Sequence, residues 1–141
     1  MNVQLYLKNL YDYLENEGKK KKEQLLKKEE ISKLTINHFY YLEVIKDLEK
    51  PTFTDLANQL NVTRPSVSTM VKVLIEQGYI NKDQSSEDGR VYFLNLTEKG
   101  KNLLKVEEEV IEEFIILIQE ALTEEELEQM AVFLKKINNH L

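Results

Sequence analysis

The chain has 141 residues, of which 42% are hydrophobic and 31% are charged, and its formal net charge is −6. This composition fits one globular domain and excludes a disordered tail, because disordered chains contain few apolar residues. The absence of cysteine excludes a disulfide or a cysteine nucleophile. No run reaches the roughly 18 apolar residues of a membrane span, and the N-terminal residues lack the order of a signal peptide. We therefore expect a cytoplasmic protein.

The acidity is concentrated at one end of the chain. Residues 106–141 hold ten acidic and two basic side chains, whereas residues 61–105 hold five acidic and seven basic ones. A polyanion responds to the local electrostatic field rather than to the total charge. The mildly basic middle of the chain is therefore compatible with nucleic acid as a partner.

The N-terminal residues predict helix. Apolar residues recur at helical spacing from Val3 to Leu14, stop at Gly18 and the run Lys19–Lys22, and resume at Leu25. The pattern predicts one long helix with a weak point or two short ones. The lysine run either faces DNA or lipid or is a solvated helix face, which is the commoner case for such runs.

Three capped helices are predicted next. Thr35 precedes INHFYYLEVIKDL, a helix that the following Lys-Pro pair ends. Thr52 and Asp55 have capping-box spacing and open the short helix FTDLANQL, which ends at Asn61. Thr63 caps a helix that runs to about residue 77, with a proline in its first turn and a glycine after its end.

Two strands and two further helices follow. YINKD and RVYFLNL are short runs typical of strands, and the joining QSSEDG predicts a hairpin with a loop longer than two residues. Thr97 then caps a long apolar-striped helix that runs to about Ala121. Thr123 and Glu126 have capping-box spacing and open a last helix.

Two short capped helices followed by a hairpin have the order of a winged helix-turn-helix. The apolar residues of the second helix can pack on those of the first: Val67, Met70, Val71 and Leu74 on Leu56, Ala57 and Leu60. Its other face is polar, and residues 62–75 contain no acid. Such a face suits the major groove of DNA, although it is also compatible with an ordinary polar helix surface. The hairpin is the second feature that favours DNA.

The stretches TFTDLANQLNVTRPSVSTMVKVLIEQGYI and SSEDGRVYFLNLTEKG resemble the multiple antibiotic resistance regulator (MarR) family over residues 31–105. The resemblance implies that Arg90, on the wing, enters the minor groove and that Asp88 holds it in place. Gly89 stands where the family often has a second arginine, so this wing has one cation fewer. Taken alone, Asp88 and Arg90 would be an ordinary surface ion pair. The predicted DNA-binding residues are Thr63, Arg64, Pro65, Ser66, Ser68, Thr69, Lys72, Asp88 and Arg90.

The resemblance also implies a homodimer that forms through interdigitated N- and C-terminal helices. It places two recognition helices roughly 34 Å apart on a near-palindromic site. The whole chain, 1–141, is then one MarR-like domain, with dimerisation helices in 1–34 and 100–141 and a DNA-binding lobe in 35–99. The apolar stripe from Val106 to Leu122 independently fits a dimer, because one small domain cannot cover it.

Many members of the family respond to a small molecule bound between the dimer helices and the DNA-binding lobe. The candidate lining residues for such an effector are Tyr11, Phe39, Tyr40, Tyr41 and Phe114. Aromatic residues at helical spacing are more often plain core, so both interpretations stay open.

Other functional classes find little support in the sequence. The two histidines, His38 and His140, lack the neighbours of a zinc site, and we expect no metal and no cofactor. No nucleophile elbow, phosphate-binding glycine loop or HExxH motif is present, so we expect no enzyme. The sequence predicts a mostly α winged helix-turn-helix homodimer that regulates transcription as a ligand-responsive repressor. The alternative is a winged helix that binds another protein instead of DNA.

Overall fold

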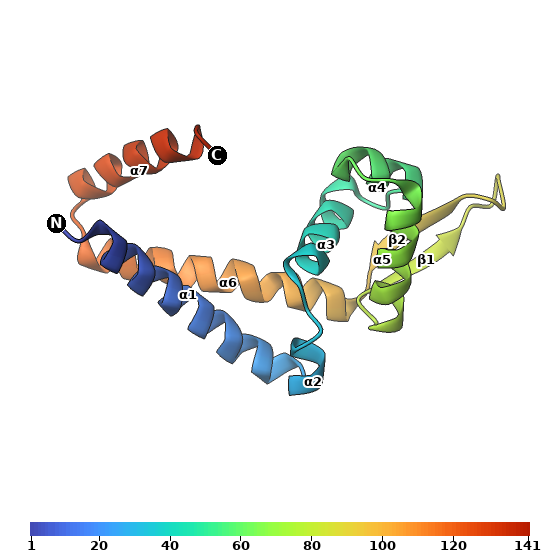
Figure 1. Ribbon diagram of the computed structural model, residues 1–141, viewed down its shortest axis with the longest axis horizontal. Coiled ribbons are helices and arrows are strands. Elements are labelled where there is room, and N and C mark those ends of the chain that lie inside the picture. Colours follow the sequence, from blue (N-terminus) through green and yellow to red (C-terminus); the bar gives the residue numbers. More distant parts are fainter. The chain divides into compact units, whose positions relative to one another are not determined.

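The computed structural model describes residues 1–141, which form seven helices and a two-stranded antiparallel sheet (Figure 1). They divide into two units, one made of residues 1–18 and 107–141 and the other of residues 19–106. The predicted fold class, mostly α with a small hairpin, is confirmed.

The helix-turn-helix lies in the unit formed by residues 19–106. It consists of α3 (Ile36–Leu48), α4 (Phe53–Leu60) and α5 (Arg64–Glu76). These bounds match the prediction because each helix has the expected cap. The hydroxyl groups of Thr35, Thr52 and Thr63 each accept a hydrogen bond from the backbone amide three residues on.

The ends of these helices also follow the local sequence. Asn61 adopts the left-handed conformation at the end of α4 with a φ of 53°. Gly78 has a φ of 81° directly after the C-cap Gln77 of α5, where a residue without a Cβ is favoured. Glu49 and Lys50, both with positive φ, separate α3 from Pro51. Of these turns, the one at Asn61 sets the direction of α5 relative to α4.

One hydrophobic core joins α3, α4 and α5 to the hairpin. The predicted packing of α5 on α4 is confirmed, since Val67, Val71, Leu74, Leu56 and Ala57 are buried, with Leu60 and Met70 packed against them. The core also takes in side chains from α3, the hairpin and the first turns of the following helix: Leu42, Ile45, Tyr79, Ile80, Leu94, Leu103 and Leu104.

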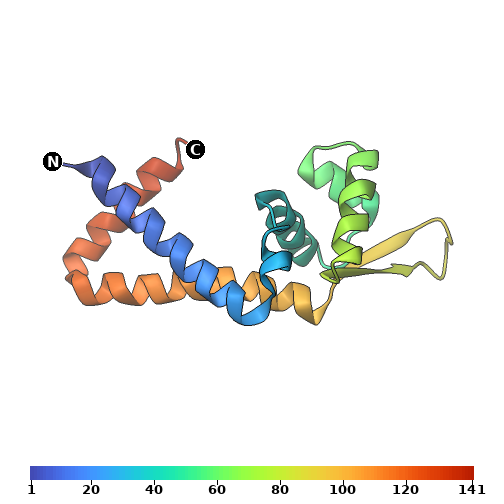
Figure 2. The ribbon, with the colours of Figure 1, turned by 60° about the horizontal axis from the view of Figure 1, so that its bottom comes forward.

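The hairpin pairs β1 (Ile80–Gln84) with β2 (Tyr92–Leu96), in the register that joins Ile80 to Leu96. Residues 85–91 form the loop between the strands, which is longer than two residues, as predicted. The amide of Leu94 donates to the carbonyl of Pro51 at 2.8 Å, which holds β2 beside the segment before α4. Figure 2 shows the loop at the far end of the hairpin.

The remaining helices are α1 (Val3–Leu25), α2 (Lys28–Ile31), α6 (Glu98–Ala121) and α7 (Glu124–Asn138). Of the two options for the first helix, the continuous one is observed, because Gly18 lies within α1 without interrupting it. The short helix α2 was not predicted.

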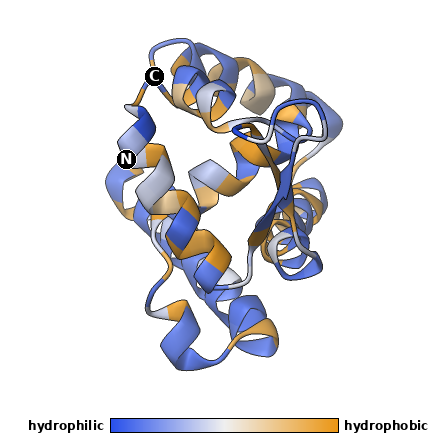
Figure 3. Cartoon of the chain, turned by 90° about the vertical axis from the view of Figure 1, so that its right-hand side faces the viewer, coloured by the Kyte–Doolittle hydropathy of each residue, from blue (hydrophilic) through white to orange (hydrophobic).

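The unit formed by residues 1–18 and 107–141 leaves much apolar surface exposed. Within it, the rings of Tyr13 and Phe114 lie 5.9 Å apart. Figure 3 shows hydrophobic and hydrophilic residues side by side along the helices. The exposed large apolar residues of this unit include Leu7, Leu10, Ile111, Ile115, Ile116, Phe133, Leu134 and Ile137.

Candidate nucleic-acid interface

The outer face of α5 is exposed and polar. Every residue predicted to contact DNA at this helix is exposed in the structure: Thr63, Arg64, Pro65, Ser66, Ser68, Thr69 and Lys72. The face contains no carboxylate before Glu76. An exposed α-helix with this chemistry has the dimensions and the donors to enter a major groove.

Internal hydrogen bonds use some of the donors and acceptors that these side chains could otherwise present to a ligand. The Thr69 hydroxyl donates to the Pro65 carbonyl at 3.0 Å, so it is left as an acceptor with an exposed methyl group. The hydroxyl groups of Thr63 and Ser66 lie 2.9 Å apart. Ser68 and Lys72 make no hydrogen bond or ion pair within the protein. Their polar groups are therefore available to a ligand without breaking an internal contact.

On the hairpin loop, Asp88 holds Arg90. The Asp88 carboxylate accepts the backbone amide of Arg90 at 3.0 Å, its Nε–H at 3.2 Å and its Nη2–H at 3.4 Å. These hydrogen bonds hold the pKa of the Asp88 carboxyl below its ordinary value, and the one from the backbone amide has the largest effect. The Arg90 side chain is still 91% exposed. The loop thus orients the Arg90 guanidinium and leaves most of the Arg90 side chain exposed to a partner.

Further hydrogen bonds tie the loop to the ends of the strands. The Gln84 amide donates to the carbonyl of Gly89 at 2.7 Å, and the Ser85 backbone amide donates to the carbonyl of Val91 at 2.8 Å. A Cβ at Gly89 would lie 3.2 Å from the Gln84 side-chain nitrogen. A larger residue at Gly89 therefore requires Gln84 to shift.

Arg64 and Arg90 come together at one groove. A recess of about 310 Å³ is lined by these two arginines, by Tyr92 and by Thr52 and Thr54 at the start of α4, and no acidic residue lines it. The first amides of a helix and two guanidinium groups form a favourable environment for phosphate. The groove therefore joins the start of the recognition helix to the wing.

The LTEKG motif, residues 96–100, holds the C-terminal end of α5 in place. The sequence did not predict this role. The Thr97 hydroxyl donates to the Gly78 carbonyl at 2.6 Å and accepts from the Gly100 amide at 3.1 Å. The Lys99 ammonium donates to the Gln77 carbonyl at 2.9 Å. A Cβ at Gly100 would overlap the Tyr79 carbonyl oxygen. The sequence LTEKG predicts a helix start and contributes to the family resemblance, but it does not reveal these contacts with the end of α5.

The predicted effector residues fall into two groups. Tyr40 and Tyr41 line one cleft within the unit of residues 19–106. In the same unit, Phe39 is packed against the core, with the Lys22 ammonium 4.7 Å from its ring centroid. Tyr11 is exposed on α1, and Phe114 contacts Tyr13; both belong to the other unit. A role for these two in effector binding stays a prediction.

The structure brings no three His, Cys, Asp or Glu side chains into an arrangement that could hold a metal ion. His38 instead completes the cap of α3, where its Nδ1 accepts the backbone amide of Thr35 at 2.8 Å. None of the helices combines the length and the apolar character that a membrane span requires.

The model of the MarR family matches residues 34–92. Over 72 residues the chain is 29% identical to the uncharacterized HTH-type transcriptional regulator YhjH of Bacillus subtilis, a match that covers 51% of this chain and 41% of YhjH. The chain therefore spans less than half the length of that relative.

Solved structures resemble the fold of this protein over nearly the whole chain. The structure of MepR from S. aureus in complex with DNA has a TM-score of 0.75 and 22% identity, with 98% of each chain covered. MepR bound to ethidium bromide also has a TM-score of 0.75 at 22% identity, covering 99% of this chain and 96% of MepR. FabT from Streptococcus pneumoniae in complex with DNA has a TM-score of 0.67 and 22% identity, with 99% and 94% covered. At this identity the likeness establishes the winged-helix fold.

Proposed function

We propose that this chain is a DNA-binding transcriptional regulator of the MarR family, whose model matches residues 34–92. It acts as a homodimer on a near-palindromic duplex site and represses transcription. The Ser66, Ser68, Thr69 and Lys72 side chains read the major groove, and Arg90 enters the adjacent minor groove, where shape more than base identity is recognised.

The observation that carries this proposal is the groove shared by Arg64 and Arg90. One DNA backbone phosphate in that groove would meet the Arg64 guanidinium and the first amides of α4, with Arg90 at the edge of the groove beside the minor groove. It would leave the acid-free face of α5 directed at the bases.

The dimer part of the proposal is supported by the exposed apolar residues of α1, α6 and α7. A second copy of the chain would cover them, with the segments 1–34 and 100–141 as the dimerisation helices and 35–99 as the DNA-binding lobe. The ten acidic residues in 106–141 would keep DNA away from this part of the chain.

A small-molecule effector and a cytoplasmic location complete the proposal. MepR has been solved both with DNA and with ethidium bromide, which supports a ligand-responsive regulator here. The proposed partner is chromosomal DNA, which supports a cytoplasmic location. The proposed activity is binding alone and includes no catalytic step.

The test begins with selection of bound duplexes from a random library, followed by fluorescence anisotropy with the selected duplex at increasing KCl. Each phosphate contact contributes about −0.9 to the slope of log K against log salt. We expect steep salt dependence, and a shallower slope for Arg90→Ala and for Arg64→Ala. Lys101→Ala, which removes a lysine that pairs with Glu98, is the charge-matched control.

If no duplex is enriched and none is retained at low salt, the proposal fails. Salt-insensitive capture of a protein partner under the same conditions would favour the alternative, a winged helix that binds protein.

A further inference from the structure

The recognition helix α5 presents a restricted set of chemical groups to the bases of DNA. Residues 62–75 contain no aspartate, glutamate, asparagine or glutamine. Asparagine and glutamine are the side chains that pair with adenine in the major groove, and acidic side chains accept a hydrogen bond from cytosine. The groups that remain on this helix can therefore read guanine, through a cationic donor, and thymine, through a methyl contact.

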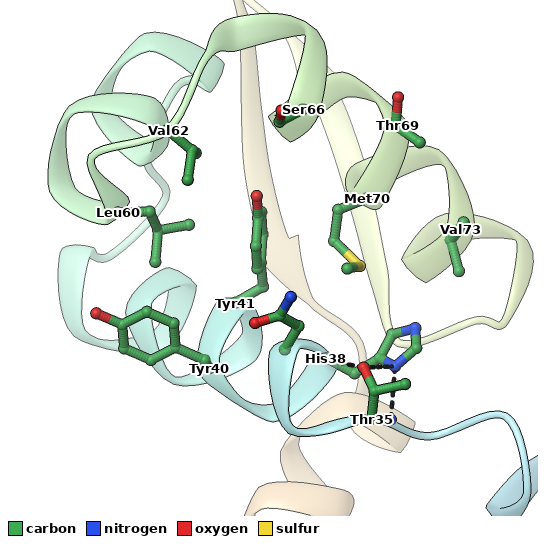
Figure 4. Close-up of a pocket in the computed structure, with 11 residues that line it drawn as sticks. Thr35, His38, Tyr40, Tyr41, Leu60, Val62, Ser66, Thr69, Met70 and Val73 are labelled. Atoms are coloured by element: carbon green, nitrogen blue, oxygen red, sulfur yellow. Dashed lines mark hydrogen bonds between the residues drawn. The ribbon is translucent and has the colours of Figure 1, made fainter.

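Thr69 presents its methyl group, because its hydroxyl is held against the helix. The hydroxyl donates to the Pro65 carbonyl at 3.0 Å, one turn earlier in α5, and the residue is exposed. In Figure 4 the Met70 side chain extends from α5 toward α3, whereas the Thr69 side chain does not. Since χ1 of a β-branched side chain is stiff, the hydrogen bond also fixes the direction of the methyl group. A fixed methyl group on a major-groove helix suits contact with the methyl group of thymine.

Lys72 supplies the cationic donor. It lies three residues after Thr69, close to one turn of helix, so both side chains are on the same exposed side of α5. Glu76, one turn further on, forms no ion pair with Lys72. Arg64, the other cation of this helix, lines the groove assigned to phosphate. Lys72 is thus the cation of α5 that is available to a base.

The two serines of this face do not determine which base is read. The Ser66 hydroxyl lies 2.9 Å from the Thr63 hydroxyl. The Ser68 hydroxyl has no partner within the protein, but a hydroxyl both donates and accepts, so it fits more than one base. Discrimination among bases therefore depends on the Thr69 methyl group and the Lys72 ammonium.

We propose that Thr69 and Lys72 select a thymine and a guanine on adjacent or next-nearest base pairs in each half of the DNA site. This inference rests on the proposed function and specifies the bases that α5 reads. Three residues of α-helix advance about 4.5 Å, close to the roughly 3.4 Å between successive base pairs. Thr69 contacts the 5-methyl group of the thymine, and the Lys72 ammonium donates to N7 and O6 of the guanine.

The thymine contact is tested with the full-length protein and the duplex selected from the random library. Each thymine is replaced in turn by deoxyuridine, which lacks only the 5-methyl group, and affinity is measured by anisotropy. Loss of one buried methyl contact should weaken wild-type binding about fourfold at one position of each half-site. Thr69→Ser keeps the hydroxyl but removes the methyl group, so it should bind both duplexes equally. Thr69→Val keeps the methyl group and is the matched control, which should still discriminate about fourfold.

The guanine contact is tested with 7-deazaguanine, which lacks the N7 acceptor. Replacing the guanine nearest to the sensitive thymine should weaken wild-type binding about fivefold, and Lys72→Met should be insensitive to this replacement. If Lys72 contacts a phosphate instead, Lys72→Met will weaken the binding of every duplex alike. That result would overturn the guanine assignment.

Failure of this inference and failure of the proposed function give different results. A deoxyuridine scan without a sensitive position, or equal sensitivity of Thr69→Ser and Thr69→Val, overturns the thymine contact. In both cases the duplex is still bound, and the proposed function stands. A protein that retains no duplex at low salt overturns both claims, because no base is then read.

Discussion

The Lys99 ammonium nitrogen lies 2.7 Å from the Glu30 carboxylate, so α2 is joined to the first turn of α6. The same nitrogen donates to the carbonyl of Gln77 at the end of α5 and lies 4.9 Å from the ring centroid of Tyr79. Several contacts hold the pKa of Glu30 below its ordinary value, and the hydrogen bond from Lys99 has the largest effect. One cation therefore connects three elements at the far end of the recognition helix.

We expect Lys99→Met to weaken DNA binding without contacting DNA. The variant keeps an apolar side chain over Tyr79 but releases the end of α5 from α2 and α6. Residues that act through a shared element change coupling by about 0.5–2 kcal/mol, so affinity should fall about twofold to thirtyfold. The measurement is anisotropy with the selected duplex. Lys101→Met makes the same chemical change two residues away, and equal losses in both variants would contradict a specific role for Lys99.

We expect Gly100→Ala to destabilise the protein strongly. The new methyl group would overlap the Tyr79 carbonyl oxygen, a backbone atom that cannot rotate away. The cost should exceed about 3 kcal/mol, in the range of severe overpacking. At Gly18, which lies inside α1 with no atom within 4 Å of an added Cβ, alanine should instead stabilise the helix by about 0.5–1 kcal/mol. Urea unfolding of both variants tests the contrast, and similar midpoints would contradict it.

We expect His38 to make the fold less stable in mild acid. Burial lowers its pKa below 6.5 in the folded protein, so the unfolded chain takes up the proton first as the pH falls. The free energy of unfolding should therefore decrease between pH 7.5 and 5.5, by at most about 1.4 kcal/mol from this group.

His38→Gln is the control for that pH dependence, because glutamine can still accept the Thr35 amide in a capping box. Urea midpoints at both pH values should show a smaller loss in acid for this variant than for wild type. An identical loss in both proteins would assign the effect to other groups.

We expect the double variant Phe133→Glu and Ile137→Glu to be a monomer. Both residues are exposed apolar side chains of α7. Burying such a side chain contributes about 1.5–3 kcal/mol, and a symmetric interface contains each residue twice. The dimer dissociation constant should rise roughly a hundredfold or more in sedimentation equilibrium. Ile36→Glu, at a residue that is 89% exposed in the other unit, should leave the dimer intact. Dissociation of both variants, or of neither, would contradict the assigned surface.

The local sequence predicted much of the fold because several helices carry their own boundaries. Thr52, Thr63 and Thr123 cap their helices, and Asn61 and Gly78 end theirs, all within a few residues along the chain. Hydrogen bonds at this range depend on residue type and spacing, which can be read directly. The four-residue helix α2 was missed because so short a segment has no periodicity to detect.

The site was predicted only in part, because its key relationships join distant residues. Exposure of the α5 face followed from helical spacing, and the Asp88–Arg90 bonds span two residues. By contrast, the shared groove of Arg64 and Arg90 depends on the tertiary packing of the hairpin beside α4. Glu30 and Lys99 are 69 residues apart. No local pattern specifies such contacts.

The most direct test of the central claim is a hydroxyl-radical footprint of the wild-type protein and Arg90→Ala on the selected duplex. Two recognition helices and two wings facing one duplex should give two protected segments about one helical turn apart, each with protection of the adjacent minor groove. Arg90→Ala should retain the two segments at higher protein concentration and lose the minor-groove protection. A single protected segment, or minor-groove protection that is unchanged in Arg90→Ala, would contradict the account.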